Sequence, residues 1–338
     1  MALEAARNLV RQRLSVDKLR VRSASIAAYR GLLASERPYP LYVAFVGVFI
    51  YFSVASPVFF SAANFLNIGR QTAFVSIIAI AMTFVIVAGE IDLSVGSTMS
   101  LSAMFAALAM QEVTNTWWMG LIAGLGTGLM VGLINGVIVA TLRIPSFLVT
   151  LGMLFIASGL ALRITFTQPV IIVNRTYDQY LGIELLGMPA GITWTIIVLV
   201  IAVPLLHFST YGRRVYATGG NAIAARYSGI RTGRITVTVF MLTGVAAGLA
   251  AVHSTAVSRA ARPDMGEALL LDVLAAVVLG GASLFGGRGW IIGTLIGSLL
   301  IGVLANGLVL TGVNPTIQLI VKGMIIIIAV AFTSRRRG

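Results

Sequence analysis

The sequence predicts an all-α polytopic membrane protein with about ten transmembrane helices, and three observations lead to this fold class. Hydrophobic residues make up 58% of the 338 residues, and charged residues only 10%. Apolar runs long enough to cross a bilayer recur along nearly the whole chain after Pro40. One pattern of residues also occurs in both halves of the chain with the same spacing. These features leave no room for a separate soluble domain.

We expect one crossing for each apolar run, with boundaries that are soft by several residues. The run at 94–111 has a Ser/Thr-rich start and the run at 269–285 is short, so either could be broken or re-entrant. The expected spans are about 41–60, 72–88, 94–111, 117–141, 146–165, 192–208, 235–257, 269–285, 290–311 and 316–333.

The internal repeat involves two Asn-Gly pairs. In each copy a Gly-Met pair follows the asparagine by 17 residues, from Asn135 to Gly152 and from Asn306 to Gly323. The copies fall five crossings apart, and an odd offset reverses the orientation of the second copy. This predicts an inverted-topology repeat, which places a pathway near the bilayer midplane. Chance similarity among glycine-rich helices is the alternative.

The basic residues predict the orientation of the chain. The N-terminal arm, 1–40, carries eight basic residues against three acids, and the tail 334–338 carries three arginines. The central loop, 209–234, carries five arginines and no acid. Cytoplasmic loops are enriched in such residues, so we expect all three segments, and therefore both termini, in the cytoplasm, flanking a membrane domain at 41–333. The arm is expected to be either an amphipathic helix on the inner leaflet or a tail that only fixes orientation.

The net charge of +13 does not indicate nucleic acid, because the arginines flank apolar spans and meet anionic membrane lipid. The chain has no cysteine and only two histidines, His207 and His253, so we expect no metal site and assign both rings structural roles. The only lysines, Lys18 and Lys322, are not followed by Ser or Thr, which excludes a phosphate-binding loop. We therefore expect no cofactor and no catalytic residue, and any ATP hydrolysis must occur in another subunit.

Two carboxylates follow the apolar run that ends at Ala88, in the segment Gly89-Glu90-Ile91-Asp92-Leu93-Ser94-Val95-Gly96-Ser97. An ionised side chain at bilayer depth is costly, so it indicates function by default. We expect Glu90 and Asp92 to cap or brace a broken span near a pathway, not to catalyse a reaction. The candidates for the pathway or for span breaks are Glu90, Asp92, Ser94, Asn135, Asp272 and Asn306.

The central loop is predicted to contain a short helix. Gly219-Gly220 is expected to break the chain, Asn221 to cap a helix from Ala222 to Tyr227, and Gly229 to end it. Such a helix, held off the membrane by glycine hinges, can fit a groove on a partner and carry its movement to the spans. A solvated basic loop is the alternative. The residues predicted for this coupling segment are Gly219, Gly220, Asn221, Ala224, Ala225, Ser228, Gly229 and Ile230.

These segments carry a resemblance to a known family. The segment 89–97 resembles the Gly-Gly-Ile-Asp-Leu-Ser-Val-Gly signature of the ribose/xylose-type permease subunits of bacterial ABC importers. The segment 219–230 is similar to that family's coupling segment, and 271–289 is similar to a further segment of the family. The likeness extends in the same order from about residue 40 to 333. Glu90 departs from the family's usual glycine, and the basic arm is not part of the pattern.

The resemblance implies the membrane-spanning subunit of an importer in the bacterial inner membrane, which passes a simple sugar by alternating access. The implied partners are a second permease subunit in a homodimer or heterodimer, a cytoplasmic ABC ATPase, and a periplasmic sugar-binding protein. On this view Asn135 and Asn306 bond either a neighbouring helix, which we favour, or sugar hydroxyls. We expect a wet, mostly uncharged pathway at the dimer or repeat interface, without a tight sugar site.

Two other functions remain open. An ion-coupled secondary transporter of a small polar solute would bind protons or sodium at its carboxylates, but it would not need a coupling segment. An intramembrane hydrolase would need a nucleophile and a base, and neither Ser254 beside His253 nor Ser283 has a recognisable triad spacing. The sequence does not indicate which sugar is transported.

Overall fold

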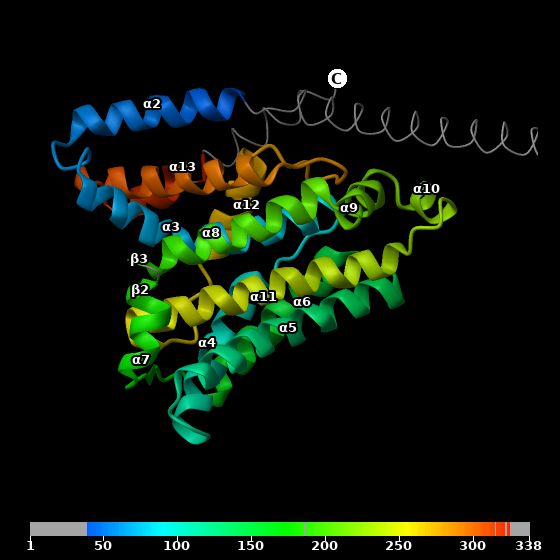
Figure 1. Ribbon diagram of the computed structural model, residues 1–338, viewed down its shortest axis with the longest axis horizontal. Helices are drawn as coiled ribbons and strands as arrows, with labels where there is room; N and C mark the ends of the chain where they lie inside the picture. Colours follow the sequence, from blue (N-terminus) through cyan, green and yellow to red (C-terminus); the bar gives the residue numbers. More distant parts are fainter. Residues whose placement is uncertain (1–38, 186, 315, 322, 325–338) are drawn as a thin grey trace, which may run out of the picture. The chain divides into compact units, whose positions relative to one another are not determined.

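The computed structural model describes residues 39–185, 187–314, 316–321 and 323–324, which belong to a single unit. Almost all of the predicted arm, 1–40, the tail, 334–338, and the second half of the predicted span 316–333 lie outside these residues. The described part of the chain is a helical bundle with four strands of two residues each (Figure 1). β1 (Val170–Ile171) pairs antiparallel with β4 (Ala260–Ala261), and β2 (Glu184–Leu185) pairs antiparallel with β3 (Met188–Pro189).

Six helices of the described part are long and apolar enough to cross a membrane, which confirms an all-α, multi-pass membrane protein. They are α3 (Ala62–Val87), α5 (Trp117–Leu142), α6 (Ser146–Ile164), α8 (Ala190–Val203) with its π-helical continuation η2 (Pro204–Phe208), α11 (Thr232–Ser258) and α13 (Ile291–Leu310). A shorter apolar helix, α2 (Tyr39–Ala55), precedes them.

The predicted span 72–88 is wrong at its start, because α3 begins ten residues earlier, at Ala62. The hydroxyl of Ser61 caps the helix by accepting a hydrogen bond from the Asn64 N–H at 3.2 Å. The first turns of α3 carry Asn64, Asn67, Arg70 and Gln71, which hide the helix from a search for apolar runs. Tertiary contacts allow this polar start, since the Asn64 side chain is buried and hydrogen-bonded.

Two further helices begin inside the bundle. α4 (Val95–Glu112) is continuous, but it follows a non-helical segment, 88–94, which we call the α4 approach. α12 (Leu269–Leu279) follows a non-helical segment, 259–268, which we call the α12 approach. The eleven residues of α12 extend only about 16 Å, half the hydrocarbon thickness of a bilayer. The predicted crossing at 269–285 is therefore not one continuous helix.

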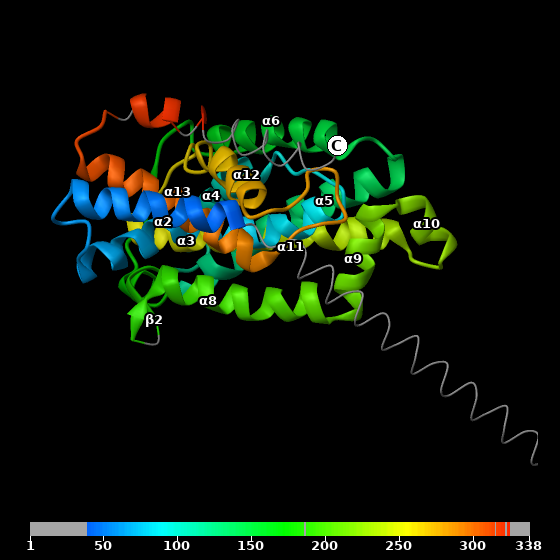
Figure 2. The same ribbon diagram turned by 90° about the horizontal axis from the view of Figure 1, so that it is seen from above.

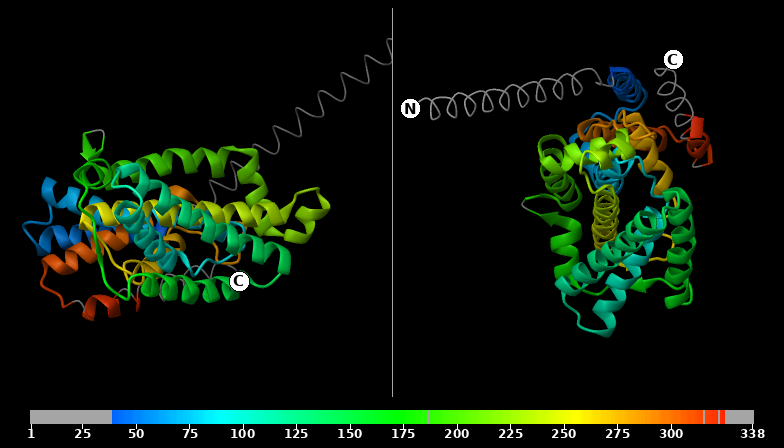
Figure 3. Two further views of the ribbon diagram at one scale, coloured as in Figure 1. Left: turned by 90° about the horizontal axis from the view of Figure 1, so that it is seen from below. Right: turned by 90° about the vertical axis from the view of Figure 1, so that its right-hand side faces the viewer.

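Antiparallel helix pairs form the centre of the bundle. α5 packs against α11 through glycines, since a Cβ on Gly128 would collide with the backbone of Gly244. α13 packs against α3 through hydroxyl pairs, Ser76 with Ser298 at 2.7 Å and Thr83 with Thr294 at 2.8 Å. α11 also contacts α3 and α4 and runs through the middle of the bundle (Figures 2 and 3).

The two ends of the bundle carry different small elements (Figure 1). At one end lie α7 (Arg175–Tyr177), the π-helix η1 (Asp178–Ile183) and the short strands. At the other end lie α9 (Thr210–Gly220) and α10 (Ala222–Tyr227), which follow η2 and lead into α11. The central loop of the sequence is therefore two helices joined by a single residue.

Candidate functional site

The predicted short helix of the central loop is confirmed as α10. The side-chain oxygen of Asn221 accepts hydrogen bonds from the N–H groups of Ile223 and Ala224, both at 3.0 Å, as an N-cap does. At the other end Gly229 adopts a positive φ of 81°. The Ile230 N–H then donates to the Ala225 carbonyl at 3.0 Å, which ends the helix in the way that glycine favours.

The faces of α10 differ in exposure. Ile223 and Tyr227, four residues apart, lie on one face and are 61% and 89% exposed. Ala224 and Ser228 are also exposed, whereas Ala225 is only 5% exposed and Ile230 packs against the bundle. The large exposed side chains that α10 offers to a partner are therefore Ile223 and Tyr227, and Ala225 faces its own chain.

Gly219 and Gly220 do not themselves break the chain as the sequence predicts, because both lie in the last turn of α9. The helix breaks one residue later, at Asn221, where φ is −160°. Gly219 is instead a point of close approach, since a Cβ there would collide with the carbonyl of Val87 and lie 2.8 Å from the backbone nitrogen of Gly287. A Cβ on Gly220 would meet nothing within 4 Å.

Gly219 therefore belongs to a contact of three backbone segments. Gly89 follows α3 with a φ of 83°, Gly286 follows α12 with a φ of 82°, and both pack against Gly219. The Gly287 N–H donates to the Val87 carbonyl at 2.9 Å. The last turn of α9, which leads into α10, is thus in direct contact with the α4 approach and with the segment that joins α12 to α13.

The surface around α10 is positively charged. The arginines of the central loop are all exposed, and no acidic residue occurs between 209 and 234. These arginines are Arg213, Arg214, Arg226, Arg231 and Arg234. A partner that docks here needs an apolar pocket and is favoured by an acidic rim.

Three of the predicted pathway residues form one buried network at the start of α4. An oxygen of Asp92 accepts from the backbone N–H of Ser94 at 2.9 Å and from its hydroxyl at 2.6 Å. The Asn135 side-chain amide donates to the Ser94 hydroxyl at 2.9 Å. Asp92 is 2% exposed, and Ser94 and Asn135 are fully buried. Asp92 thus braces the residue before α4 and does not bond the first turn of the helix itself.

Glu90 and the rest of the α4 approach are bound to two neighbouring helices. Glu90 is half-buried and accepts a hydrogen bond from the Thr236 hydroxyl of α11 at 3.3 Å. From α6, the Ser146 hydroxyl accepts from the Ile91 N–H at 3.0 Å, and the Thr150 hydroxyl accepts from the Leu93 N–H at 3.1 Å. The sequence analysis missed these three hydroxyl residues, whose only signal is a polar position inside or beside an apolar run.

The other two candidates lie apart from this network. Asn306 forms a reciprocal pair of amide hydrogen bonds with Asn64, both at 3.0 Å, at the start of α3 and hence at the opposite end of the bundle. Asp272 is half-buried in the first turn of α12, where the helix dipole favours an acid. The six candidates therefore do not form one site.

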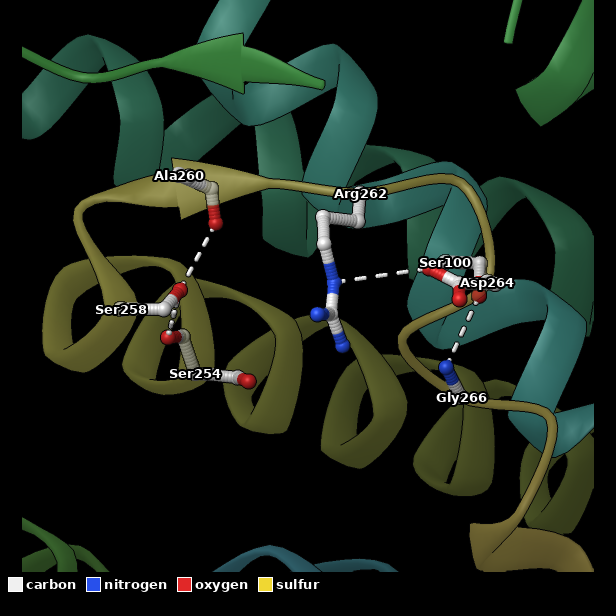
Figure 4. Close-up of polar contacts among 7 residues, drawn as sticks. All are labelled: Ser100, Ser254, Ser258, Ala260, Arg262, Asp264 and Gly266. Carbon is white, nitrogen blue, oxygen red and sulfur yellow. Dashed lines mark hydrogen bonds and ion pairs between the residues drawn. The ribbon is translucent and has the colours of Figure 1, made fainter. Parts of the chain in front are cut away.

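The histidines are bound to groups of this chain. His207 accepts from the Ile291 N–H at 3.2 Å through Nε2, and His253 Nδ1 lies 2.7 Å from the Leu181 carbonyl. No group of three side chains that could hold a metal ion occurs in the described part of the chain. Beside His253, the backbone carbonyl of Ser254 accepts from the Ser258 hydroxyl at 2.8 Å, an ordinary helix contact (Figure 4).

Comparison with known proteins identifies the family. The profile of a family described as "Branched-chain amino acid transport system / permease component" matches residues 64–330. The ribose import permease protein RbsC of Bacillus subtilis is 41% identical over 298 residues, which cover 86% of this chain and 92% of the relative. The fructose import permease protein FrcC of Rhizobium meliloti is 34% identical over 308 residues, which cover 89% of this chain and 86% of the relative.

The L-arabinose ABC transporter permease protein AraH of Azospirillum brasilense is also 34% identical, over 87% of this chain and 86% of its own. No solved structure matches the chain. The family resemblance predicted from the sequence is thus confirmed, and the chain belongs to this family of ABC-transporter permease components.

Proposed function

We propose that this chain is the membrane-spanning subunit of an ATP-driven importer that passes a simple sugar across the bacterial inner membrane. The relatives that are named for import of ribose or fructose, or as an L-arabinose ABC transporter permease, match more than four fifths of the chain. The structural observation that carries the proposal is α10, a capped helix with an apolar exposed face inside a basic loop. An ion-coupled transporter has no use for such a helix.

In this proposal α10 docks into a groove of a cytoplasmic ATPase subunit. An amphipathic helix binds a groove through apolar residues at helical spacing, and Ile223 with Tyr227 supply that pair. Movement of α10 reaches the bundle through Gly219. This residue touches the backbone at the end of α3, at Val87, and the backbone of Gly287 in the segment that joins α12 to α13. This chain contributes no catalysis, and it works with a second permease subunit and a periplasmic sugar-binding protein.

The packing of two helix pairs supports the inverted repeat of the proposed fold. The repeat pairs α5 with α13 and α11 with α3, and the contact of α5 with α11 indeed has a counterpart in that of α13 with α3. Asn135 lies near the α10 end and Asn306 near the opposite end, as an inverted repeat requires. In this proposal the arginines around α10 face the cytoplasm, and the even number of crossings proposed from the sequence puts both termini on the same side.

The pathway in this proposal alternates its access under the control of the ATPase. The buried network of Asp92, Ser94 and Asn135 holds the break before α4 in place, and the approach segment meets α9 at Gly219. The binding protein selects the sugar, and the permease offers a transient passage of low affinity.

The test replaces the exposed face of α10. Tyr227→Asp and Ile223→Asp should abolish co-purification with the ATPase subunit and sugar-stimulated ATP hydrolysis in proteoliposomes. Ile183→Asp is the matched control, because Ile183 is 56% exposed but lies in η1 at the other end of the bundle. Normal sugar uptake by both α10 variants would refute the docking role, and uptake driven by an ion gradient alone would favour the secondary transporter.

A further inference from the structure

The α12 approach reaches the inside of the bilayer. The Gly266 N–H donates to the Ser100 hydroxyl of α4 at 3.0 Å (Figure 4), and neither Gly266 nor Gly96 could carry a Cβ without colliding with the other's carbonyl. The starts of α4 and α12 are therefore in backbone contact. Gly266 lies at the depth of the second residue of α4.

The depth of Gly266 in the membrane follows from the position of Asn135 along α5. Ser94, which precedes α4, is bonded to Asn135, seven residues before the end of α5 and eighteen after its start. At a rise of 1.5 Å per residue, Asn135 lies about 10 Å from one end of α5 and about 27 Å from the other. The hydrocarbon layer is about 30 Å thick, so the contact of Gly96 with Gly266 lies within it.

The α12 approach exposes charged side chains. Glu267, next to Gly266, is exposed. Before it, the side chains of Arg262 and Asp264 are 62% and 60% exposed and lie 3.5 Å apart. One turn beyond it, Leu271 is 62% exposed. We call the four residues Arg262, Asp264, Glu267 and Leu271 the α12 surface.

The exposed face of α6 has the opposite composition. It presents large apolar side chains, including Phe147, Phe155, Ile156 and Leu160, which are 46%, 67%, 56% and 47% exposed. Such a face suits lipid tails. A carboxylate at the depth of Glu267 does not, because an ionised group in hydrocarbon is costly and therefore faces a protein interior or water.

We propose that the α12 surface lines the water-filled passage of the assembled importer, where Glu267 meets the transported solute. The inference rests on the proposed function, and it gives the passage a charged wall where the sequence predicts a mostly uncharged one. A carboxylate accepts hydrogen bonds from neighbouring hydroxyl groups, and Leu271 offers an apolar surface beside it, which together suit a neutral polyhydroxylated solute.

The chain contains no cysteine, so single-cysteine variants carry one thiol each. Glu267→Cys and the control Phe155→Cys replace two exposed residues, one on the α12 surface and one on the proposed lipid face. Each is assembled with cysteine-free partner subunits in proteoliposomes and treated on both sides with a charged, membrane-impermeant methanethiosulfonate. Glu267→Cys should react more than about tenfold faster than Phe155→Cys, and sugar uptake should fall as it reacts.

Equal, slow reaction of both variants would overturn the inference while the proposed function stands, provided that the assembled importer takes up sugar. If the importer takes up no sugar, the proposed function fails, and the ratio of the two reaction rates still decides whether the α12 surface meets water. Leu271→Cys repeats the comparison one turn further along α12, should Glu267→Cys not assemble.

Discussion

The α4 approach and the α12 approach bring two helix starts together, but their surroundings differ. In the first, Asp92 and Ser94 are buried and bonded to each other, to Asn135 and, through the neighbouring backbone, to α6. In the second, Asp264 and Glu267 are exposed. Two segments that each carry two acidic residues can thus have different tasks in a membrane protein, one holding the backbone and the other meeting water. Burial decides between them.

The largest effect is expected where the two approach segments touch. Gly266→Ala places a methyl group against the Gly96 carbonyl, and the backbone on both sides must move. We expect a loss of about 3 kcal/mol of stability, seen as a lower thermal unfolding temperature in detergent. Gly220→Ala is the control, since a Cβ there meets nothing within 4 Å. Equal unfolding temperatures would show that α4 and α12 do not start in contact.

The second prediction separates the two acids directly. Asp92→Ala removes the carboxylate oxygen that accepts from both the N–H and the hydroxyl of Ser94, and it leaves a buried N–H group without its partner, which should cost about 2 kcal/mol. Glu267→Ala should change stability by less than about 0.5 kcal/mol, because its side chain is exposed. Thermal unfolding of the two variants in parallel measures the difference. A destabilisation of the same size in both would remove the distinction between the two segments.

The third prediction concerns the contact that both segments share with α9. Gly219→Ala pushes α9 away from Val87 and Gly287, and so from the α4 approach and from the segment after α12. We expect fewer sugar molecules imported per ATP hydrolysed, by roughly fivefold, or about 1 kcal/mol of coupling free energy. Gly220→Ala should leave that ratio unchanged. Identical ratios in the two variants would mean that α10 acts on the bundle by another route.

The smallest effect is expected at the start of the α12 approach. Arg259 pairs with Asp178 at 2.8 Å, and burial raises the pKa of Asp178 while Arg259 opposes that rise. A raised pKa means that the charged acid disfavours the folded state, so the contribution of Asp178 to stability falls as pH rises through its folded pKa. Arg259→Ala should therefore cost about 1 kcal/mol at neutral pH and less at acidic pH. Thermal unfolding of Arg259→Ala and of the unchanged chain at several pH values measures this loss of stability. A loss that does not change with pH would show that it does not come from the pair of Arg259 and Asp178.

The sequence by itself determined the features that depend on neighbouring residues. Composition and apolar runs predicted the membrane class, and Asn221 and Gly229 predicted the bounds of α10, because a cap acts within a few residues of its own helix. The segments 89–97 and 219–230 likewise carried the family resemblance, which the comparisons confirm.

Only the tertiary structure decided which residues meet. It showed that Gly219 is a point of close contact, that Ala225 is buried, and that the polar start of α3 includes a buried Asn64 bonded to Asn306. The partners Ile91 with Ser146 and Asn64 with Asn306 are 55 and 242 residues apart. A single sequence carries no signal of such pairs, since a hydroxyl or amide in an apolar run looks the same whether it faces a helix, a lipid or the passage.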